Sequence, residues 1–170
     1  KIGIDEKILN KQGKLTAEEF EIMKTHTLIG ATMLKHMTVY QNEAIVKIAC
    51  QICRWHHERY DGMGYPDGLK GDEIPLCAQV VGLVDAYDAL VSVRPYKRKL
   101  KHEEAIRMIA NGECGVFSKK LLQCFIAAAM QKEWIKKADS FDEVDRERVT
   151  EQFIRVMNAC HQIFGKYAFR

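Results

Sequence analysis

The stretch "HHERYDGMGYPDGLKGDEIP", residues 56–75, is the most informative part of the sequence. It begins with two adjacent histidines and continues into a run rich in glycine and aspartate. Its two Asp-Gly dipeptides predict turns, and Pro66 moves the preceding Tyr65 away from helical geometry. We therefore expect a helix that ends at the histidine pair, followed by a long loop of defined conformation.

Helical spacing precedes this loop. Thr16 and Glu19 form a capping-box pattern, which predicts a helix from Thr16 to about His36. Four of its apolar side chains are expected to be buried, namely Phe20, Met23, Leu28 and Leu34. Asn42 is the expected N-cap of the next helix, whose apolar residues recur at three- and four-residue spacing as far as His56.

Helical patterns also follow the loop, and no segment shows the alternation of a strand. They predict helices over residues 75–93, 102–110 and 118–137. A second capping-box pattern, Ser140 with Glu143, predicts a last helix. The sequence therefore predicts an all-α fold, a helical bundle with one long ordered loop.

The composition fits one globular domain. Of the 170 residues 47% are hydrophobic and the formal net charge is +3, which does not indicate a DNA or RNA partner. No apolar run reaches the roughly 18 residues of a membrane span, and the first residues lack the apolar core of a signal peptide. We expect a cytoplasmic protein, and because the chain begins at Lys1 rather than Met, we expect it to be a piece of a longer one.

The six cysteines favour reduced thiols in the core, because most fall at apolar helical positions and no secretory signal is visible. The segment "CQICRWHH" allows another interpretation, a local zinc site. Its ligands would be Cys50, Cys53, His56 and His57. Four ligands along one helix rise too far to surround one ion, which argues against this site.

Histidines and an aspartate on three predicted helices indicate a different metal site. His26 lies on the first helix, His56 and His57 end the second, and Asp85 lies in an apolar run of the third. A lone histidine on an apolar face is more often a hydrogen-bonded core residue. Adjacent helical residues point about 100° apart, so both histidines can reach one site only at the helix end. A buried aspartate also needs a partner, and the set predicts a metal centre.

Two cations, Arg94 and Lys97 in "VSVRPYKRK", follow Asp85. They could form a solvated basic turn that complements the helix dipole. Beside a metal centre, a guanidinium and an ammonium group are also what phosphate recognition requires.

The stretch "HHERYDGMGYPDGLKGDEIPLCAQVVGLVDAYDALVSVRPYK", preceded by "GKLTAEEFEIMKTHTLIG", resembles the signature of HD-GYP domains, a branch of the HD metal-dependent phosphohydrolases. The resemblance covers residues 1–115 and implies an HD-type helical bundle with an ordered Gly-Tyr-Pro loop. We expect residues 1–137 to form this domain. Residues 138–170 would add a helix that packs on the bundle or extends it.

The resemblance implies hydrolysis of the bacterial second messenger cyclic di-GMP to the linear dinucleotide or GMP. The family uses two or three divalent metal ions, usually iron or manganese. Residues that resemble its metal ligands are His26, His56, His57 and Asp85, and those that resemble its substrate contacts are Tyr65, Arg94 and Lys97. Lys1 resembles the catalytic lysine of the motif His-Asp-x-x-Lys. An upstream sensory or receiver domain and a homodimer are further expectations.

The sequence departs from the family pattern in two places. The His and Asp of that motif would lie directly before Lys1 and are not in this sequence, so we expect an incomplete metal cluster. Ser118-Lys119 stands where the family commonly has Asp-Pro. Two alternatives stay open: a phosphohydrolase for another nucleotide, such as a hybrid cyclic dinucleotide, and a binding module without activity. The residues upstream of Lys1 would distinguish the second from an enzyme.

Overall fold

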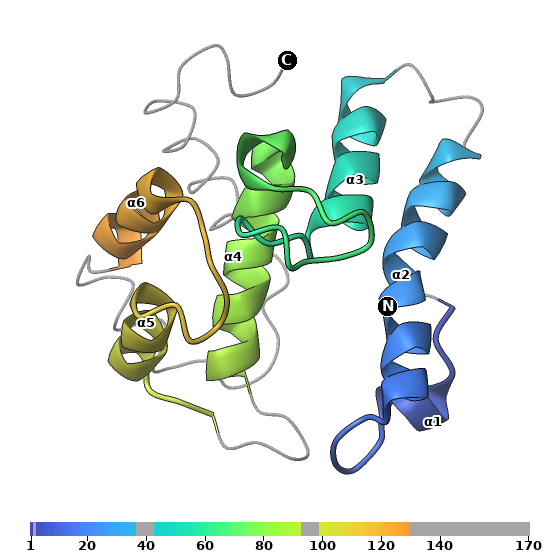
Figure 1. Ribbon diagram of the computed structural model, residues 1–170, viewed down its shortest axis with the longest axis horizontal. Coiled ribbons are helices and arrows are strands. Elements are labelled where there is room, and N and C mark those ends of the chain that lie inside the picture. Colours follow the sequence, from blue (N-terminus) through green and yellow to red (C-terminus); the bar gives the residue numbers. More distant parts are fainter. Residues whose placement is uncertain (2, 37–42, 93–98, 130–170) are drawn as a thin grey trace. The chain divides into compact units, whose positions relative to one another are not determined.

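The computed structural model describes residues 1, 3–36, 43–92 and 99–129. In these residues it is helical, with six α-helices, one short 3-10 helix and no strand (Figure 1), which confirms the predicted all-α class. The helices are α1 (Glu6–Leu9), α2 (Ala17–Lys35), α3 (Ala44–Trp55), α4 (Leu76–Val91), α5 (His102–Ala110) and α6 (Lys119–Ala129), with the 3-10 helix η2 at Gly71–Glu73. The described residues divide into two compact units, residues 1–82 and residues 83–92 with 99–129.

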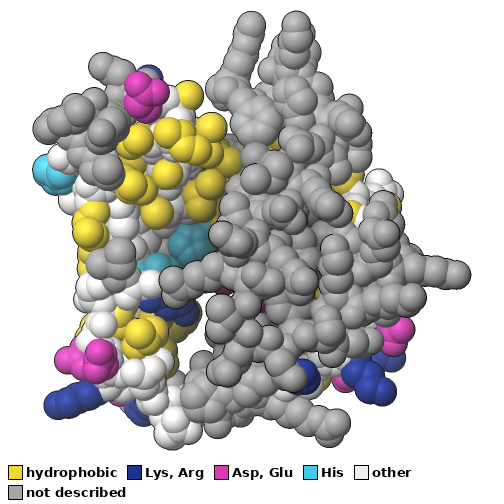
Figure 2. Space-filling view, turned by 180° about the vertical axis from the view of Figure 1, so that it is seen from behind, with side chains coloured by type: hydrophobic (Ala, Val, Ile, Leu, Met, Phe, Trp, Pro, Cys, Tyr) yellow, Lys and Arg dark blue, Asp and Glu magenta, His cyan; other side chains and the backbone are white. Residues whose placement is uncertain are grey.

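The first unit is built on α2, whose start is the predicted capping box. The Thr16 hydroxyl accepts from the Glu19 N–H at 3.2 Å, and the Glu19 carboxylate accepts from the Thr16 N–H at 2.7 Å. The face of α2 that is buried carries Met23, His26, Thr27 and Ala31. Burial of Phe20 and Leu28 was predicted wrongly, since they are 44% and 38% exposed. Hydrophobic side chains are also visible at the surface of the described residues in Figure 2. Helical spacing shows which residues share a face of α2, but it does not show which face the rest of the chain covers.

Helix α3 packs beside α2 (Figure 1). A side-chain carbon added at Gly30 of α2 would lie 3.5 Å from Cys53 of α3, an ordinary van der Waals distance. The predicted N-cap, Asn42, lies outside the described residues, and α3 instead begins after Glu43, whose side chain makes no capping bond. The helix ends at Trp55 with His56 at the C-cap, as predicted.

The second unit contains most of α4 together with α5 and α6. Its core is formed by Leu83, Leu90, Ala105, Ile109, Leu121 and Phe125, all of which are buried. The predicted helices over 75–93 and 102–110 are confirmed within two residues at each end. Ser140, Glu143 and all residues from 130 onward lie outside the described residues. The domain boundary at residue 137 therefore stays a prediction.

Two further expectations concern cysteines and membranes. Cys50, Cys53, Cys77 and Cys124 are reduced thiols, which agrees with the predicted redox state, but of these four only Cys77 is buried and the others are half-buried. Cys160 lies outside the described residues. Among the described helices, none combines the length and the apolarity that a membrane span needs.

Candidate metal centre

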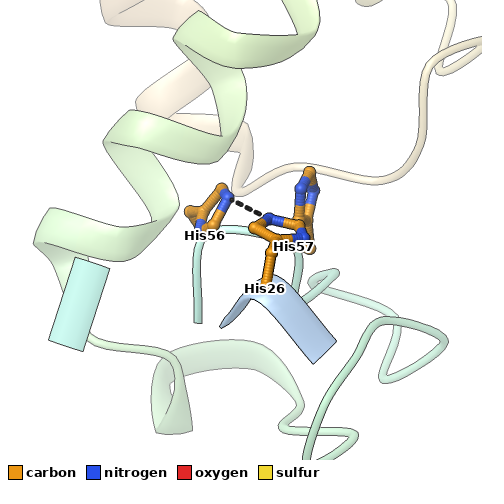
Figure 3. A group of neighbouring side chains, drawn as sticks. All are labelled: His26, His56 and His57. Atoms are coloured by element: carbon orange, nitrogen blue, oxygen red, sulfur yellow. Dashed lines mark hydrogen bonds between the residues drawn. The ribbon is translucent and has the colours of Figure 1, made fainter. Parts of the chain in front are cut away.

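Three histidines meet where the end of α3 lies against α2 (Figure 3). His26 comes from α2, while His56 and His57 come from the C-terminal end of α3. One ring nitrogen from each lies within 4.8 Å of the other two. His26 is buried and the other two are half-buried. The predicted meeting of the histidine pair and His26 is thus present in the structure.

Hydrogen bonds fix the orientation of two of the rings. The Nδ1 of His26 lies 2.6 Å from the carbonyl oxygen of Met23, and the Nδ1 of His56 lies 2.8 Å from that of Ile52. A carbonyl oxygen can only accept, so both Nδ1 atoms carry a proton. In the neutral rings each Nε2 is then a bare lone pair. These two Nε2 atoms face each other at 3.3 Å, the contact drawn as a dashed line in Figure 3.

Two facing lone pairs repel unless a proton or a cation lies between them. The fit to a metal ion is good, because two bonds of about 2.1 Å at an angle of about 90–110° place their nitrogens about 3.0–3.4 Å apart. Carbonyl oxygens that accept from the far nitrogen of a ligating histidine are the usual second layer of such sites. The donor set, neutral imidazole nitrogen, suits iron, zinc, copper or nickel better than calcium.

The surroundings favour the neutral form of two of the rings, those of His57 and His26. Burial, together with the nearby charges of His56, His26 and Lys1, lowers the pKa of His57 to about 3. The pKa of His26 is also lowered, mainly by burial and less by His56 and Lys1. Metal ions bind the deprotonated ring, so both histidines are in their ligand form at neutral pH.

Two glycines bring the backbone close enough to hold the pair in place. A side-chain carbon at Gly82 of α4 would lie 2.6 Å from the His56 carbonyl oxygen, and one at Gly64 would lie 2.3 Å from the Arg59 nitrogen. Neither position has room for another residue. The loop therefore folds back against the segment that follows His57, where the Tyr65 N–H donates to the His57 carbonyl oxygen at 3.2 Å.

Glu58 also holds this loop in place. Its side chain is buried, and its carboxylate accepts three backbone N–H groups, from Asp67 at 2.7 Å, Gly68 at 3.1 Å and Leu69 at 3.0 Å. The sequence interpretation missed this residue. Its position could have indicated the role, because it is a carboxylate between a helix end and a glycine-rich loop. The backbone N–H groups of such a loop need acceptors, which a carboxylate supplies.

A second clamp lies at the loop surface. The Asp67 carboxylate accepts two N–H groups of Arg54, at 2.7 and 2.8 Å, and the indole N–H of Trp55 at 2.7 Å. Arg54 first, and then the indole, lowers the pKa of Asp67. With Glu58, this clamp ties the loop to the end of α3, next to the histidines.

Comparison with known proteins identifies the family. Residues 1–114 match the model of the HD domain. The chain belongs to the HD domain family.

Similar curated proteins carry related names. The chain is 45% identical over 126 residues to a cyclic di-GMP phosphodiesterase of Thermotoga maritima, covering 74% of this chain and 33% of that protein. It is 38% identical over 135 residues to the cyclic di-GMP phosphodiesterase response regulator RpfG of Xanthomonas campestris, covering 79% and 35%. It is 32% identical over 126 residues to the 3'3'-cGAMP-specific phosphodiesterase 2 of Vibrio cholerae, covering 74% and 23%. These matches agree with the HD-GYP resemblance, and the chain spans about a third or less of each relative.

The remaining predicted residues of this HD domain differ in their outcome. The ring of Tyr65 stacks on that of His57 with centroids 4.8 Å apart, so it lies beside the three histidines, and its predicted contact with the substrate stays a prediction. Lys1 is exposed, and its positive charge contributes to the lowered pKa of His26 and of His57, while its predicted catalytic role stays a prediction.

Three other predicted residues are not tested. Arg94 and Lys97 lie outside the described residues. Asp85 is half-buried on α4 and belongs to the second unit, so its place as a fourth ligand stays a prediction. The alternative zinc site with Cys50 and Cys53 is not formed, since the group of ligand atoms in the described residues contains the three histidines and no cysteine.

Proposed function

We propose that this HD domain is a metal-dependent phosphodiesterase that hydrolyses cyclic di-GMP to the linear dinucleotide or GMP. The observation that carries the proposal is the pair of facing Nε2 atoms of His26 and His56, 3.3 Å apart, with His57 beside them. This geometry favours a bound cation. The names of the relatives in Thermotoga maritima and Xanthomonas campestris support the choice of substrate.

Each residue has an expected part in the reaction. His26, His56 and His57 would hold divalent metal, with Asp85 as a further ligand of a cluster of two or three iron or manganese ions. Bound metal supplies an activated water and neutralises charge on the phosphoryl oxygens.

The other residues would act on the substrate. The positive charge of Lys1 near the rings stabilises the anionic phosphate as its charge grows in the transition state. Tyr65 would border the substrate, while Arg94 and Lys97 would bind a phosphate.

A second candidate substrate is 3'3'-cGAMP. It is favoured by the 32% identity to the Vibrio cholerae enzyme whose name specifies that nucleotide. Imidazoles and metal ions act on the phosphodiester and do not distinguish bases. Discrimination between the two substrates must come from residues outside the metal centre.

The proposal includes a biological setting. One relative is named a response regulator, which supports the expectation that an upstream receiver or sensory domain controls the HD domain. The site of action would be the bacterial cytoplasm, and a homodimer is the proposed assembly.

Metal analysis combined with a turnover assay tests the function. The 170-residue chain and a chain extended upstream of Lys1 are purified, their metals are counted by mass spectrometry, and hydrolysis of cyclic di-GMP and 3'3'-cGAMP is followed by chromatography. We expect the extended chain to bind more metal and to be far more active. His36→Ala is the matched control for substitutions of the three clustered histidines, since His36 is an exposed histidine at the end of α2. An extended chain that binds metal and cleaves neither nucleotide would refute the proposal.

A further inference from the structure

An exposed aromatic residue lies next to the metal centre without a role in the core. Phe20 is 44% exposed and meets Tyr65 edge to face, with ring centroids 6.1 Å apart. The ammonium group of Lys24 lies 5.0 Å from the centroid of Phe20 and 5.7 Å from that of Tyr65. We call Phe20, Lys24 and Tyr65 the aromatic–lysine cluster.

The cluster adjoins the metal centre. Phe20 and Lys24 are four residues apart and share a face of α2, while Tyr65 comes from the loop and stacks on His57. A nucleotide carries its base one sugar away from its phosphate. Phe20 lies one ring beyond Tyr65, so a nucleotide held at the metal centre by its phosphate would bring a base to this cluster.

Stability does not account for the arrangement. Met23, one turn along α2, is 8% exposed and supplies the core contact that Phe20 does not make. Lys24 donates to the Glu21 carboxylate at 2.6 Å, but Glu21 is 70% exposed, and exposed pairs contribute little. An open aromatic ring beside a cation is the combination by which proteins hold the bases of single-stranded nucleotides.

We propose that the aromatic–lysine cluster binds a purine base of the cyclic dinucleotide and, with Glu21, favours guanine over adenine. This inference rests on the proposed function and adds the recognition of the base, which the metal centre cannot provide. Phe20 packs against the face of the base. The adjacent Lys24 and Glu21 supply one group that only donates and one that only accepts hydrogen bonds.

The preference for guanine follows from the pattern at the edge of each base. Guanine presents the acceptor O6, to which Lys24 donates, and an N2 amino group, from which Glu21 accepts. Adenine has an amino group in place of O6 and lacks the N2 amino group. A donor would then face a donor at Lys24, which disfavours adenine.

Calorimetric titrations of the metal-loaded chain with hydrolysis-resistant analogues of cyclic di-GMP and cyclic di-AMP measure this preference. The variants are Phe20→Ala and Lys24→Met, with folding checked by circular dichroism. Phe20→Ala is expected to weaken binding of both nucleotides about tenfold, since stacking on an aromatic side chain is lost. Lys24→Met is expected to weaken cyclic di-GMP about tenfold and cyclic di-AMP little.

Controls on the same helix are Ile22→Ala, which removes an exposed apolar residue, and Lys35→Met, which removes a lysine from the last turn. Both should bind like the wild type. Affinities of Phe20→Ala and Lys24→Met equal to those of the controls, or a wild-type chain that binds neither nucleotide, would overturn the base site. If the extended chain still cleaves cyclic di-GMP, the proposed function survives that result. Base binding without any cleavage would instead refute the function and leave the base site.

Discussion

Two parts of the molecule place buried histidines in opposite situations. In the second unit both ring nitrogens of His102 have partners, the Tyr87 hydroxyl at 2.7 Å and the Ala129 carbonyl oxygen at 2.9 Å. The carbonyl accepts, so Nε2 of His102 carries the proton and Nδ1 accepts from Tyr87. In the first unit, His26 and His56 each satisfy one nitrogen with a carbonyl and turn the other toward its neighbour.

The difference separates a histidine with a structural role from a pair that could hold a metal ion. His102 joins α5 to the end of α6 and leaves no lone pair to bind a metal. The first-unit pair leaves two lone pairs 3.3 Å apart, an arrangement that repels without a cation. Burial alone does not distinguish the cases, because His102 is 4% exposed and His26 is 8% exposed. The two histidines differ in the second ring nitrogen, which accepts a hydrogen bond in His102 and faces another ring nitrogen in His26.

The largest expected effect is on the first-unit histidines. His56→Ala or His57→Ala should abolish turnover and lower bound metal together, since losing a ligand or its support costs at least about ten- to a hundredfold in affinity or activity. Metal per chain and the rate of cyclic di-GMP hydrolysis measure both effects in the extended chain. Normal metal content and rate in either variant would mean that the histidine pair is structural, and the contrast with His102 would disappear.

The second prediction concerns His102, where a substitution should change the stability of the fold and leave metal binding unchanged. His102→Phe should lower the free energy of unfolding by about 2–4 kcal/mol, because the Tyr87 hydroxyl and the Ala129 carbonyl lose a buried partner. Metal affinity of the first unit should not change. Urea unfolding gives the stability, and titration of the folded variant with Mn²⁺ gives the affinity. Wild-type stability with weakened metal binding would reverse the roles that we assign to the two sites.

The sequence predicted the cluster of three histidines better than its surroundings. His56 and His57 were found because adjacent histidines at a helix end have few structural uses, and His26 because it completed the set. Which nitrogen of each ring is free depends on the carbonyl oxygens of Met23 and Ile52, and no pattern of residue types specifies that.

Other features were beyond sequence reasoning for similar reasons. Helical periodicity predicted α2 well, yet the face that the neighbouring helix covers is a tertiary property, so Phe20 was wrongly placed in the core. The role of Glu58 depends on three backbone N–H groups nine to eleven residues later, and a loop path of that kind has no periodic signal.

A third prediction concerns the support of the loop. Glu58→Gln should raise the rate of hydrogen exchange at the amides of Asp67, Gly68 and Leu69, because hydrogen bonds to a charged acceptor contribute about 1.5–3 kcal/mol and the neutral amide turns a donor toward the N–H groups. Metal content should stay unchanged. Asp61→Asn is the control, since its carboxylate accepts from the Met63 N–H of the same loop at 2.9 Å. Unchanged exchange at all three amides would refute the anchoring role.

The effect that is smallest at neutral pH, and grows on acidification, is a pH dependence of the metal-free chain. The pKa of His57 is lowered to about 3 in the folded protein, against about 6.5 in an unfolded chain. Between these values the unfolded state binds the extra proton, so stability is complete above pH 6.5 and falls as the pH is lowered toward 3, by at most about 1.4 kcal/mol per pH unit. Urea midpoints of wild type and His57→Gln with a chelator present, measured from pH 7.5 to 4, isolate this contribution because all other groups titrate in both. The wild type should lose stability faster on acidification. Equal slopes would show that His57 is protonated as readily in the folded chain as in the unfolded one, and the reason for assigning it a neutral ligand form would be lost.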